Sequence, residues 1–212
     1  MTQILPATSG KAIRLARRLL RAGEIVAFPT DTVYGVGANA FERYAVRQIF
    51  AIKQRPPEKA LPVFIYQIDD LNQVARRVPN EAWIVLQKFW PGALTVVLPK
   101  NPRLPDDVTA GQETVAVRIP DHPTCLELIS QVGRPLAVTS ANRSGQPTPT
   151  TAQGVAGQLG PALPLVLDGG PSPASQPSTI IDLSASLPRL LRPGPISLAA
   201  LRELLPDLEV RD

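Results

Sequence analysis

Short apolar runs alternate along the chain with longer segments in which apolar residues recur every three or four positions. The longer segments predict helices over residues 11–22, 42–52, 70–78, 80–89, 123–132, 152–159 and 198–205. The apolar runs predict strands over residues 24–28, 61–65, 94–98, 114–119, 136–138, 165–167, 179–183 and 189–192. Strands that alternate with helices indicate an α/β fold, and the last two predicted strands have no helix between them. We therefore expect a twisted mixed sheet flanked by helices, in a single domain over residues 1–212 with its core at about 8–200.

The predicted strand at 24–28 leads into a stretch of small polar residues. Pro29 ends the strand because it has no backbone N–H to donate. Hydroxyl and carboxylate side chains follow it: Thr30, Asp31, Thr32 and Tyr34. Gly35 and Gly37 come next, and we expect them to let the backbone approach a ligand closely. Strand ends of this kind form binding crevices in open α/β sheets, but these residues alone fit a solvent-facing turn equally well.

Two further segments carry groups that bind oxyanions. Lys53, Arg55 and Lys59 lie on a loop that paired prolines keep out of a helix, so they form either a phosphate site or a solvated charged turn. The loop lacks the glycine and lysine spacing of a P-loop. Residues 139–145 follow another short strand with hydroxyl and amide side chains, which hold ribose, phosphate or carboxylate in binding sites and otherwise form turns.

Four isolated polar residues stand in apolar surroundings. Arg118 lies inside an apolar strand, so it should meet either a protein carboxylate or a bound anion. Arg192 presents the same two alternatives. His122 has no nucleophile motif nearby, and we interpret it as a helix-entry residue. Cys125 falls on the apolar face of the helix that follows, which favours burial.

Charge and cysteine content narrow the class of protein. The net charge of +4 and the pI near 9.6 indicate anionic partners, although 17 Arg against 5 Lys could also reflect a GC-rich genome. A single cysteine excludes an internal disulfide, and one Cys with one His nearly excludes a structural zinc site. No apolar run approaches the roughly 20 residues that span a bilayer, and the N-terminus has no secretory signal pattern. We therefore expect a cytoplasmic protein that does not insert into membranes.

Six motifs occur in the order found in the YrdC-like family, which the chain resembles over residues 8–200. They lie at residues 29–35, 53–59, 90–92, 117–123, 139–145 and 192–194. Each motif alone is weak, but six in order across one domain are highly specific. The resemblance implies the YrdC-like α/β fold, in the short form that lacks the C-terminal domain of longer members.

The family contains the threonylcarbamoyl-AMP synthases, so the resemblance implies an enzyme that uses ATP, L-threonine and bicarbonate or carbon dioxide. The products would be threonylcarbamoyl-adenylate and pyrophosphate, with Mg²⁺ accompanying ATP and no protein-held metal. The adenylate would pass to downstream tRNA threonylcarbamoyl-transfer proteins. tRNA or other double-stranded RNA is a further implied partner.

The family's functional residues can be carried over by motif. L-Threonine would be held by Thr32, Arg118, the backbone at Val138, and Ser178. ATP would be held by Arg55, Lys59, Thr114, Ser140, Thr148 and Arg192. Among these, the cations that would stabilise the reacting phosphates are Arg55, Lys59 and Arg192. Three more positions match the motifs without a defined role: Tyr34, Lys53 and Asn142. Some family members have His where this chain has Phe64.

Two other functions compete with this one. A carbamoyl-adenylate-forming domain, as in hydrogenase maturation factors, would resemble the same family but sits in longer chains with zinc-finger and acylphosphatase-like parts. A non-catalytic RNA-binding or RNA-maturation module would use the basic surface. That module would need stacking aromatics, yet aromatic residues make up only 5% of the chain.

Overall fold

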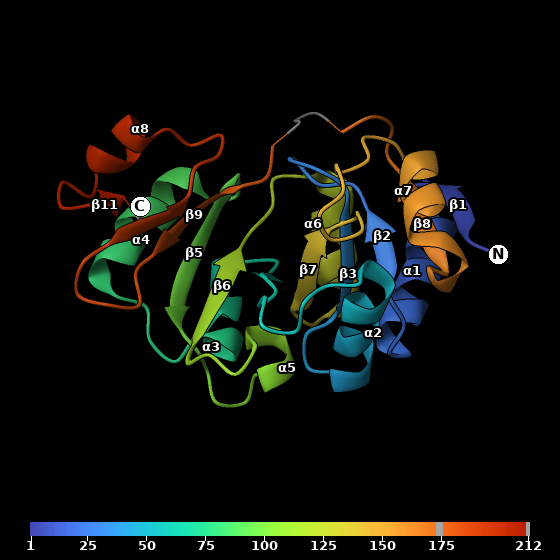
Figure 1. Cartoon of the computed structure of the whole chain (residues 1–212), viewed down its shortest axis with the longest axis horizontal. Helices are drawn as coiled ribbons and strands as arrows, with labels where there is room; N and C mark the ends of the chain where they lie inside the picture. Colours follow the sequence, from blue (N-terminus) through green and yellow to red (C-terminus); the bar gives the residue numbers. More distant parts are fainter. Residues whose placement is uncertain (173–175, 211–212) are drawn as a thin grey trace.

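A computed structural model of the chain describes residues 1–172 and 176–210. Within these residues, the strands form one sheet with the spatial order β1-β8-β2-β3-β7-β4-β6-β5-β9-β10-β11 (Figure 1). The strands are β1 (Gln3–Pro6), β2 (Val26–Phe28), β3 (Gly35–Asn39), β4 (Val63–Phe64), β5 (Leu94–Pro99), β6 (Thr114–Arg118), β7 (Leu136–Ser140), β8 (Leu165–Asp168), β9 (Thr179–Asp182), β10 (Arg189–Arg192) and β11 (Glu209–Val210). Parallel pairs such as β2–β8 and β4–β6 stand beside antiparallel pairs such as β2–β3 and β5–β6. The prediction of a mixed sheet is confirmed.

Helices cover both faces of this sheet. They are α1 (Gly10–Arg21), α2 (Arg43–Lys53), α3 (Leu71–Val74), α4 (Asn80–Phe89), α5 (Asp106–Thr109), α6 (Pro123–Val132), α7 (Ala152–Leu159) and α8 (Leu198–Arg202), with short 3-10 turns η1 (Ile68–Asp70) and η2 (Gly160–Ala162). Side chains alternate along the strands, so Val26 and Phe28 join the apolar cluster under α1 and α6. Ile25 and Ala27 instead join the larger cluster that includes residues of α2, α4 and α7.

Helix ends follow the chemistry of their terminal residues. The Ser9 hydroxyl accepts from the Ala12 N–H at the start of α1, and the Thr151 hydroxyl accepts from the Gly154 N–H at the start of α7. Gly133 ends α6 with φ of +70°, in the left-handed region that glycine enters without strain. These caps explain why the predicted bounds of α1, α6 and α7 are close to those observed.

Strand β3 is the most central of the elements that the sequence did not predict. Its residues, Gly-Val-Gly-Ala-Asn, are typical of a loop, and we expected Gly35 and Gly37 to make room for a ligand. Gly35 does line the cavity described below, but both glycines also make room for neighbouring side chains. A Cβ at Gly37 would lie 3.0 Å from the Phe28 ring, and one at Gly35 would lie 2.9 Å from a methyl group of Val138. Packing between neighbouring strands, which is not visible in local sequence, stabilises β3.

Other differences from the predicted elements are smaller. The sequence did not predict β1, α5 or β11. The helix predicted at 70–78 ends at Val74, and the one predicted at 198–205 ends at Arg202. The proline-rich loop expected at 171–177 lies partly outside the described residues. Across residues 1–172 and 176–210, every helix is too short or too polar to cross a bilayer.

Candidate active site

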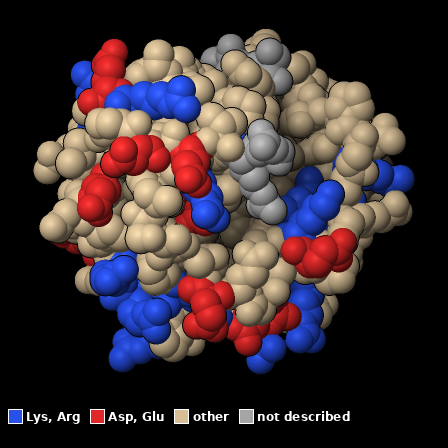
Figure 2. Space-filling model, turned by 60° about the vertical axis from the view of Figure 1, so that its left-hand side comes forward, with Lys and Arg blue, Asp and Glu red and all other residues tan. Residues whose placement is uncertain are grey.

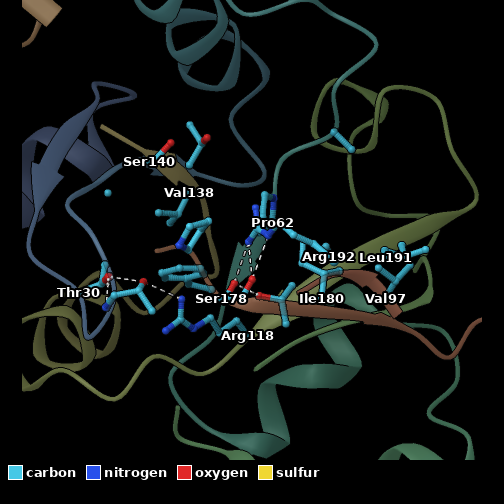
Figure 3. A pocket seen from close by; sticks show the side chains of 18 of the residues that line it. Thr30, Pro62, Val97, Arg118, Val138, Ser140, Ser178, Ile180, Leu191 and Arg192 are labelled. Atoms are coloured by element: carbon cyan, nitrogen blue, oxygen red, sulfur yellow. Dashed lines mark hydrogen bonds between the residues drawn. The ribbon is translucent and has the colours of Figure 1, made fainter. Parts of the chain in front are cut away.

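A cavity of about 450 Å³ opens where the two halves of the sheet meet at β4. Its lining comes from β3 and β7 on one side of β4, from β5, β6, β9 and β10 on the other, and from the loops after β2 and α2. Figure 3 shows side chains from both halves converging on this space. Eight residues that the sequence predicted as site residues line it: Thr32, Arg55, Thr114, Arg118, Val138, Ser140, Ser178 and Arg192.

The loop after β2 forms one wall of the cavity through a hydroxyl network. The Thr30 hydroxyl donates to the Val33 carbonyl at 2.7 Å and accepts from the Thr32 N–H at 3.1 Å. The hydroxyl oxygens of Thr30 and Thr32 are 3.1 Å apart, and both residues are 2% exposed. Because these bonds fix the loop, the Thr32 hydroxyl has a defined place at the cavity wall.

Arg118 meets the protein carboxylate that its position in β6 requires. The side chain is 2% exposed, and its Nη2 lies 2.6 Å from Asp31 Oδ2. Nη1 donates to Thr32 Oγ1 at 3.1 Å, and Nε donates to the Gly92 carbonyl at 2.8 Å. The Phe64 ring lies 5.5 Å from the guanidinium carbon, within the range of a cation–π contact. Burial lowers the pKa of Arg118, whereas the Asp31 charge raises it.

A second arginine enters the same cavity from β10. Arg192 donates through Nε and Nη2 to the Ser178 carbonyl at 3.0 and 2.7 Å, and through Nη2 to the Ser178 hydroxyl at 3.1 Å (Figure 3). The Ser178 and Thr95 hydroxyl oxygens are 2.8 Å apart. Burial lowers the pKa of Arg192, and the positive charge of Arg118 lowers it further. Two arginines therefore lie close enough in this cavity for their charges to affect each other.

The basic loop after α2 contributes one cation to the lining. Arg55 lines the cavity, while its Nε and Nη2 donate to the carbonyls of Lys59 and Ala60 at 3.0 and 2.8 Å. The guanidinium thus braces its own loop as well as facing the cavity. Lys59 is exposed and does not belong to the lining.

Lys53 lies behind the lining. Its side chain is 1% exposed and donates to the backbone carbonyls of Ser140 and Asn142. The Ser140 hydroxyl donates to the Asn142 side-chain oxygen, and the Ser144 N–H donates to the Lys53 carbonyl at 2.9 Å. Burial, with the nearby charge of Arg55, lowers the pKa of Lys53 to about 7. Lys53 and Asn142 therefore join the end of α2 to the end of β7, and Ser140 faces the cavity.

Two more predicted residues also lie outside the lining. The Tyr34 hydroxyl donates to the Gly170 carbonyl at 2.7 Å and accepts from the Gly169 N–H at 3.1 Å. Burial raises its pKa. Thr148 is half-buried on the connection before α7.

Several lining residues were missed by the sequence reasoning, although strand periodicity carries a signal for them. On β6, Thr114, Ala116 and Arg118 face the cavity, whereas the residues between them are buried in the core. The same alternation places Thr95 and Val97 of β5, and Ile180 and Asp182 of β9, in the lining. Leu191 lines the cavity beside Arg192, where the pairing of β10 with β9 shifts register. Alternation predicts which residues of a strand share a face, but which strands border the cavity depends on the sheet order.

The remaining predicted features can be placed as well. His122 precedes α6 at its N-cap position, and Cys125 is fully buried, which raises the pKa of its thiol. No group of three His, Cys, Asp or Glu side chains within residues 1–172 and 176–210 is arranged to hold a metal ion. On the face shown in Figure 2, basic and acidic side chains are interspersed and do not form one large basic patch.

Comparison with known proteins gives consistent matches. A family model for Sua5, YciO and YrdC proteins, described as "Telomere recombination", matches residues 18–194. Threonylcarbamoyl-AMP synthase from Bacillus subtilis is 44% identical over 96% of this chain, and the enzyme of that name from Pyrococcus abyssi is 42% identical over 93%. The matched regions are 59% and 58% of those two proteins, so the chain spans about three fifths of their length.

The fold agrees with the same relatives. The solved structure of P. abyssi Sua5 in complex with L-threonine superimposes with a TM-score of 0.96 at 40% identity, over 99% of this chain and 63% of that one. The family model and these relatives together cover the cavity, the basic loop and both arginines. The chain therefore belongs to the Sua5/YciO/YrdC family.

Proposed function

We propose that the chain is a threonylcarbamoyl-AMP synthase, a nucleotidyltransferase that joins L-threonine, bicarbonate or carbon dioxide, and ATP. The observation that carries this proposal is a single cavity with two kinds of cationic site. Arg118 is fully buried and pairs with Asp31, whereas Arg55 and Arg192 are half-buried in the same lining and donate to neutral acceptors. A small carboxylate and a polyphosphate require such an arrangement. The names of the relatives from B. subtilis and P. abyssi support it.

We place the amino acid beside Arg118. Guanidinium groups bind carboxylates through charge-assisted hydrogen bonds, and the Thr32 and Ser178 hydroxyls are within the same part of the cavity. The Val138 backbone completes this set, as the family resemblance implies. The relative from P. abyssi binds L-threonine in its crystal structure, which agrees with a threonine site in this fold.

ATP would occupy the rest of the cavity. Ser140, Thr114, Arg55 and Arg192 supply hydroxyl and guanidinium donors for its phosphates, and the apolar side chains of β5, β9 and β10 suit a nucleobase. Mg²⁺ would enter with ATP as part of the substrate, because phosphate oxygens and water are ligands that this ion prefers. Contacts from Lys59 and Thr148 to ATP remain predictions.

The chemistry needs positioning more than a side-chain nucleophile. The neutral amine of threonine adds to carbon dioxide and loses a proton, which gives a carbamate with an anionic oxygen. This oxygen attacks the α-phosphorus of ATP, the bond to the β-phosphate bridging oxygen breaks, and pyrophosphate leaves. Arg55 and Arg192 would stabilise the charge that spreads over the phosphate oxygens, while Arg118 holds the amino acid in line.

The decisive experiment is pyrophosphate release by the purified chain. ATP with Mg²⁺, threonine and bicarbonate should give pyrophosphate together with an adenylate that contains labelled threonine. Omission of threonine or of bicarbonate should stop the release. No release with all three substrates would refute the proposal, and release that requires carbamoyl phosphate would favour the activity of hydrogenase maturation factors.

The labile adenylate needs a consumer in the same compartment. We propose a cytoplasmic location, where tRNA threonylcarbamoyl-transfer proteins would use it. The single buried cysteine agrees with a reducing compartment. Binding of tRNA or other double-stranded RNA remains a prediction.

A further inference from the structure

Asp31 lies next to the cavity without entering its lining. It belongs to the loop after β2, its side chain is 15% exposed, and it pairs with Arg118 at 2.6 Å. Its other carboxylate oxygen, Oδ1, is buried and has no hydrogen-bond partner among the residues that the structure describes. Neither the proposed chemistry nor any motif gives this carboxylate a role.

We propose that Asp31 is a positioning residue, which orients the Arg118 guanidinium for the carboxylate of the amino-acid substrate. This inference rests on the proposed function. Asp31 acts through Arg118 and does not touch the substrate. Loss of Asp31 should therefore weaken binding of the amino acid and leave binding of ATP unchanged.

The contacts around Arg118 show why one of them dominates its orientation. Three acceptors from separate segments hold the guanidinium: Asp31 Oδ2, Thr32 Oγ1 and the Gly92 carbonyl. Only Asp31 is charged, and its bond is the shortest of the three. All three bonds are charge-assisted because their donor is a guanidinium, but only the bond to Asp31 adds the attraction between two opposite charges. Without Asp31, the guanidinium would keep its neutral acceptors but would lose its strongest constraint.

Burial adds a second reason. A cation that is 2% exposed is costly unless a charge compensates it. Asp31 supplies this compensation from the loop after β2. Arg118 has five N–H groups, three of which donate to these acceptors. The remaining two, one on each terminal nitrogen, are left for an incoming carboxylate.

A purely structural ion pair offers the control. Asp107 accepts from Arg43 and Arg47 at 2.7 and 2.6 Å, but both of these arginines are about two-thirds exposed and lie outside the cavity lining. Asp107→Asn removes a carboxylate that pairs with arginines outside the cavity lining. It therefore separates loss of a charge pair from loss of orientation at Arg118.

The experiment compares the Michaelis constants for threonine and for ATP in Asp31→Asn, Asp31→Ala and Asp107→Asn. Asp31→Ala should raise the threonine KM by roughly tenfold or more, the effect of losing one charge-assisted hydrogen bond. The ATP KM should stay within about twofold. Asp31→Asn, which keeps an oxygen acceptor, should show a smaller rise, and Asp107→Asn should show none.

A double-mutant cycle tests whether the effect passes through Arg118. The threonine affinity of Arg118→Lys should fall no further when Asp31→Asn is added, because the oriented guanidinium is already lost. Additive effects, or equal changes in both Michaelis constants, would overturn the proposal.

Calorimetric measurement of threonine binding tests the role of Asp31 independently of the proposed enzymatic function. A wild-type chain that binds threonine but releases no pyrophosphate refutes the function, and the Asp31 comparison still stands on the binding data.

Discussion

Arg55 has two roles in the structure, and two measurements on one substitution distinguish them. It lines the cavity and also donates to two carbonyls of its own loop. Arg55→Ala should lower kcat by about 10²–10³, the usual loss for one donor to a developing charge. The loss of two loop bonds should also lower the melting temperature modestly. Steady-state kinetics with thermal unfolding measure both, and Lys88→Ala provides a control at an exposed cation outside the lining. Equal loss of turnover in both variants would contradict the distinction.

His122 makes stability depend on pH. Burial lowers its pKa, and the charges of Asp31 and Asp121 only partly offset this. A histidine whose pKa is lower in the folded than in the unfolded protein stabilises the fold when the pH is above its ordinary pKa near 6.5. This contribution is lost as the pH falls toward the folded-state pKa. The free energy of unfolding, measured with urea at pH 7.5 and 5.5, should therefore decrease toward the lower pH. His122→Gln should show a smaller decrease, because this is the only histidine in the chain. Identical pH dependence in the two proteins would contradict the assignment.

At the scale of single residues, the sequence predicted a contact correctly where a buried charge requires a partner of opposite charge. An arginine in an apolar strand must meet an anion, and Arg118 does. Asp182 was missed, because its place in the cavity depends on β5 and β9 lying side by side. Lys53 shows the converse case. Its motif resembles a phosphate site, but the fold brings two backbone carbonyls of the 140–142 turn to its ammonium group.

Among the elements, the turn after β10 is held in place by a glycine. A Cβ at Gly194 would lie 2.4 Å from the Thr179 nitrogen and 2.8 Å from the Pro177 carbonyl oxygen, and backbone atoms cannot rotate away. Gly194→Ala should destabilise the protein by about 1–3 kcal/mol, as other overpacked sites do. It should also weaken substrate binding, since Ser178 and Arg192 flank this contact.

Gly157 provides the matched control for that substitution. It lies in α7, where a Cβ would meet nothing within 4 Å. Gly157→Ala should therefore stabilise the protein by up to about 1 kcal/mol, because alanine favours the helix. Denaturant unfolding measures both changes. A neutral or stabilising effect of Gly194→Ala would show that the turn can move.

Elements with a strong local pattern were predicted well, and those without one were not. The helix at 123–132 has an apolar face, a proline at its first position and a terminal glycine, and its bounds agree with the structure. β1 has only four residues and lies at the edge of the sheet, where it pairs with β8 more than 150 residues later. The apolar run of β8 predicted a strand there, but the four residues of β1 carry no pattern that indicates its pairing with β8.

At the scale of the whole molecule, the two proposed substrate sites share one cavity, so ligands should stabilise the fold as a unit. Threonine at about 100 times its dissociation constant should raise the free energy of unfolding by about 2.7 kcal/mol. Threoninamide, which lacks the carboxylate, should give a much smaller rise, because Arg118 is the buried cation in the proposed amino-acid site. Thermal unfolding with each compound measures the difference. Equal shifts would place the amino acid away from Arg118.

Strand β4 joins the two halves of the sheet through very few hydrogen bonds. Among the residues that the structure describes, only Val63 and Phe64 connect β7 to β6 by strand pairing, with one flanking bond from the Ile65 N–H to the Arg118 carbonyl and another from the Val138 N–H to the Pro62 carbonyl. A force that pulls the two halves apart would act on these few bonds and on the bonds from Arg118 to Asp31 and Thr32, which also join the halves. The cavity lies across this narrow connection. A molecule that fills the cavity and binds both sides would share this force, so the substrates themselves should strengthen the sheet at its two-residue central strand.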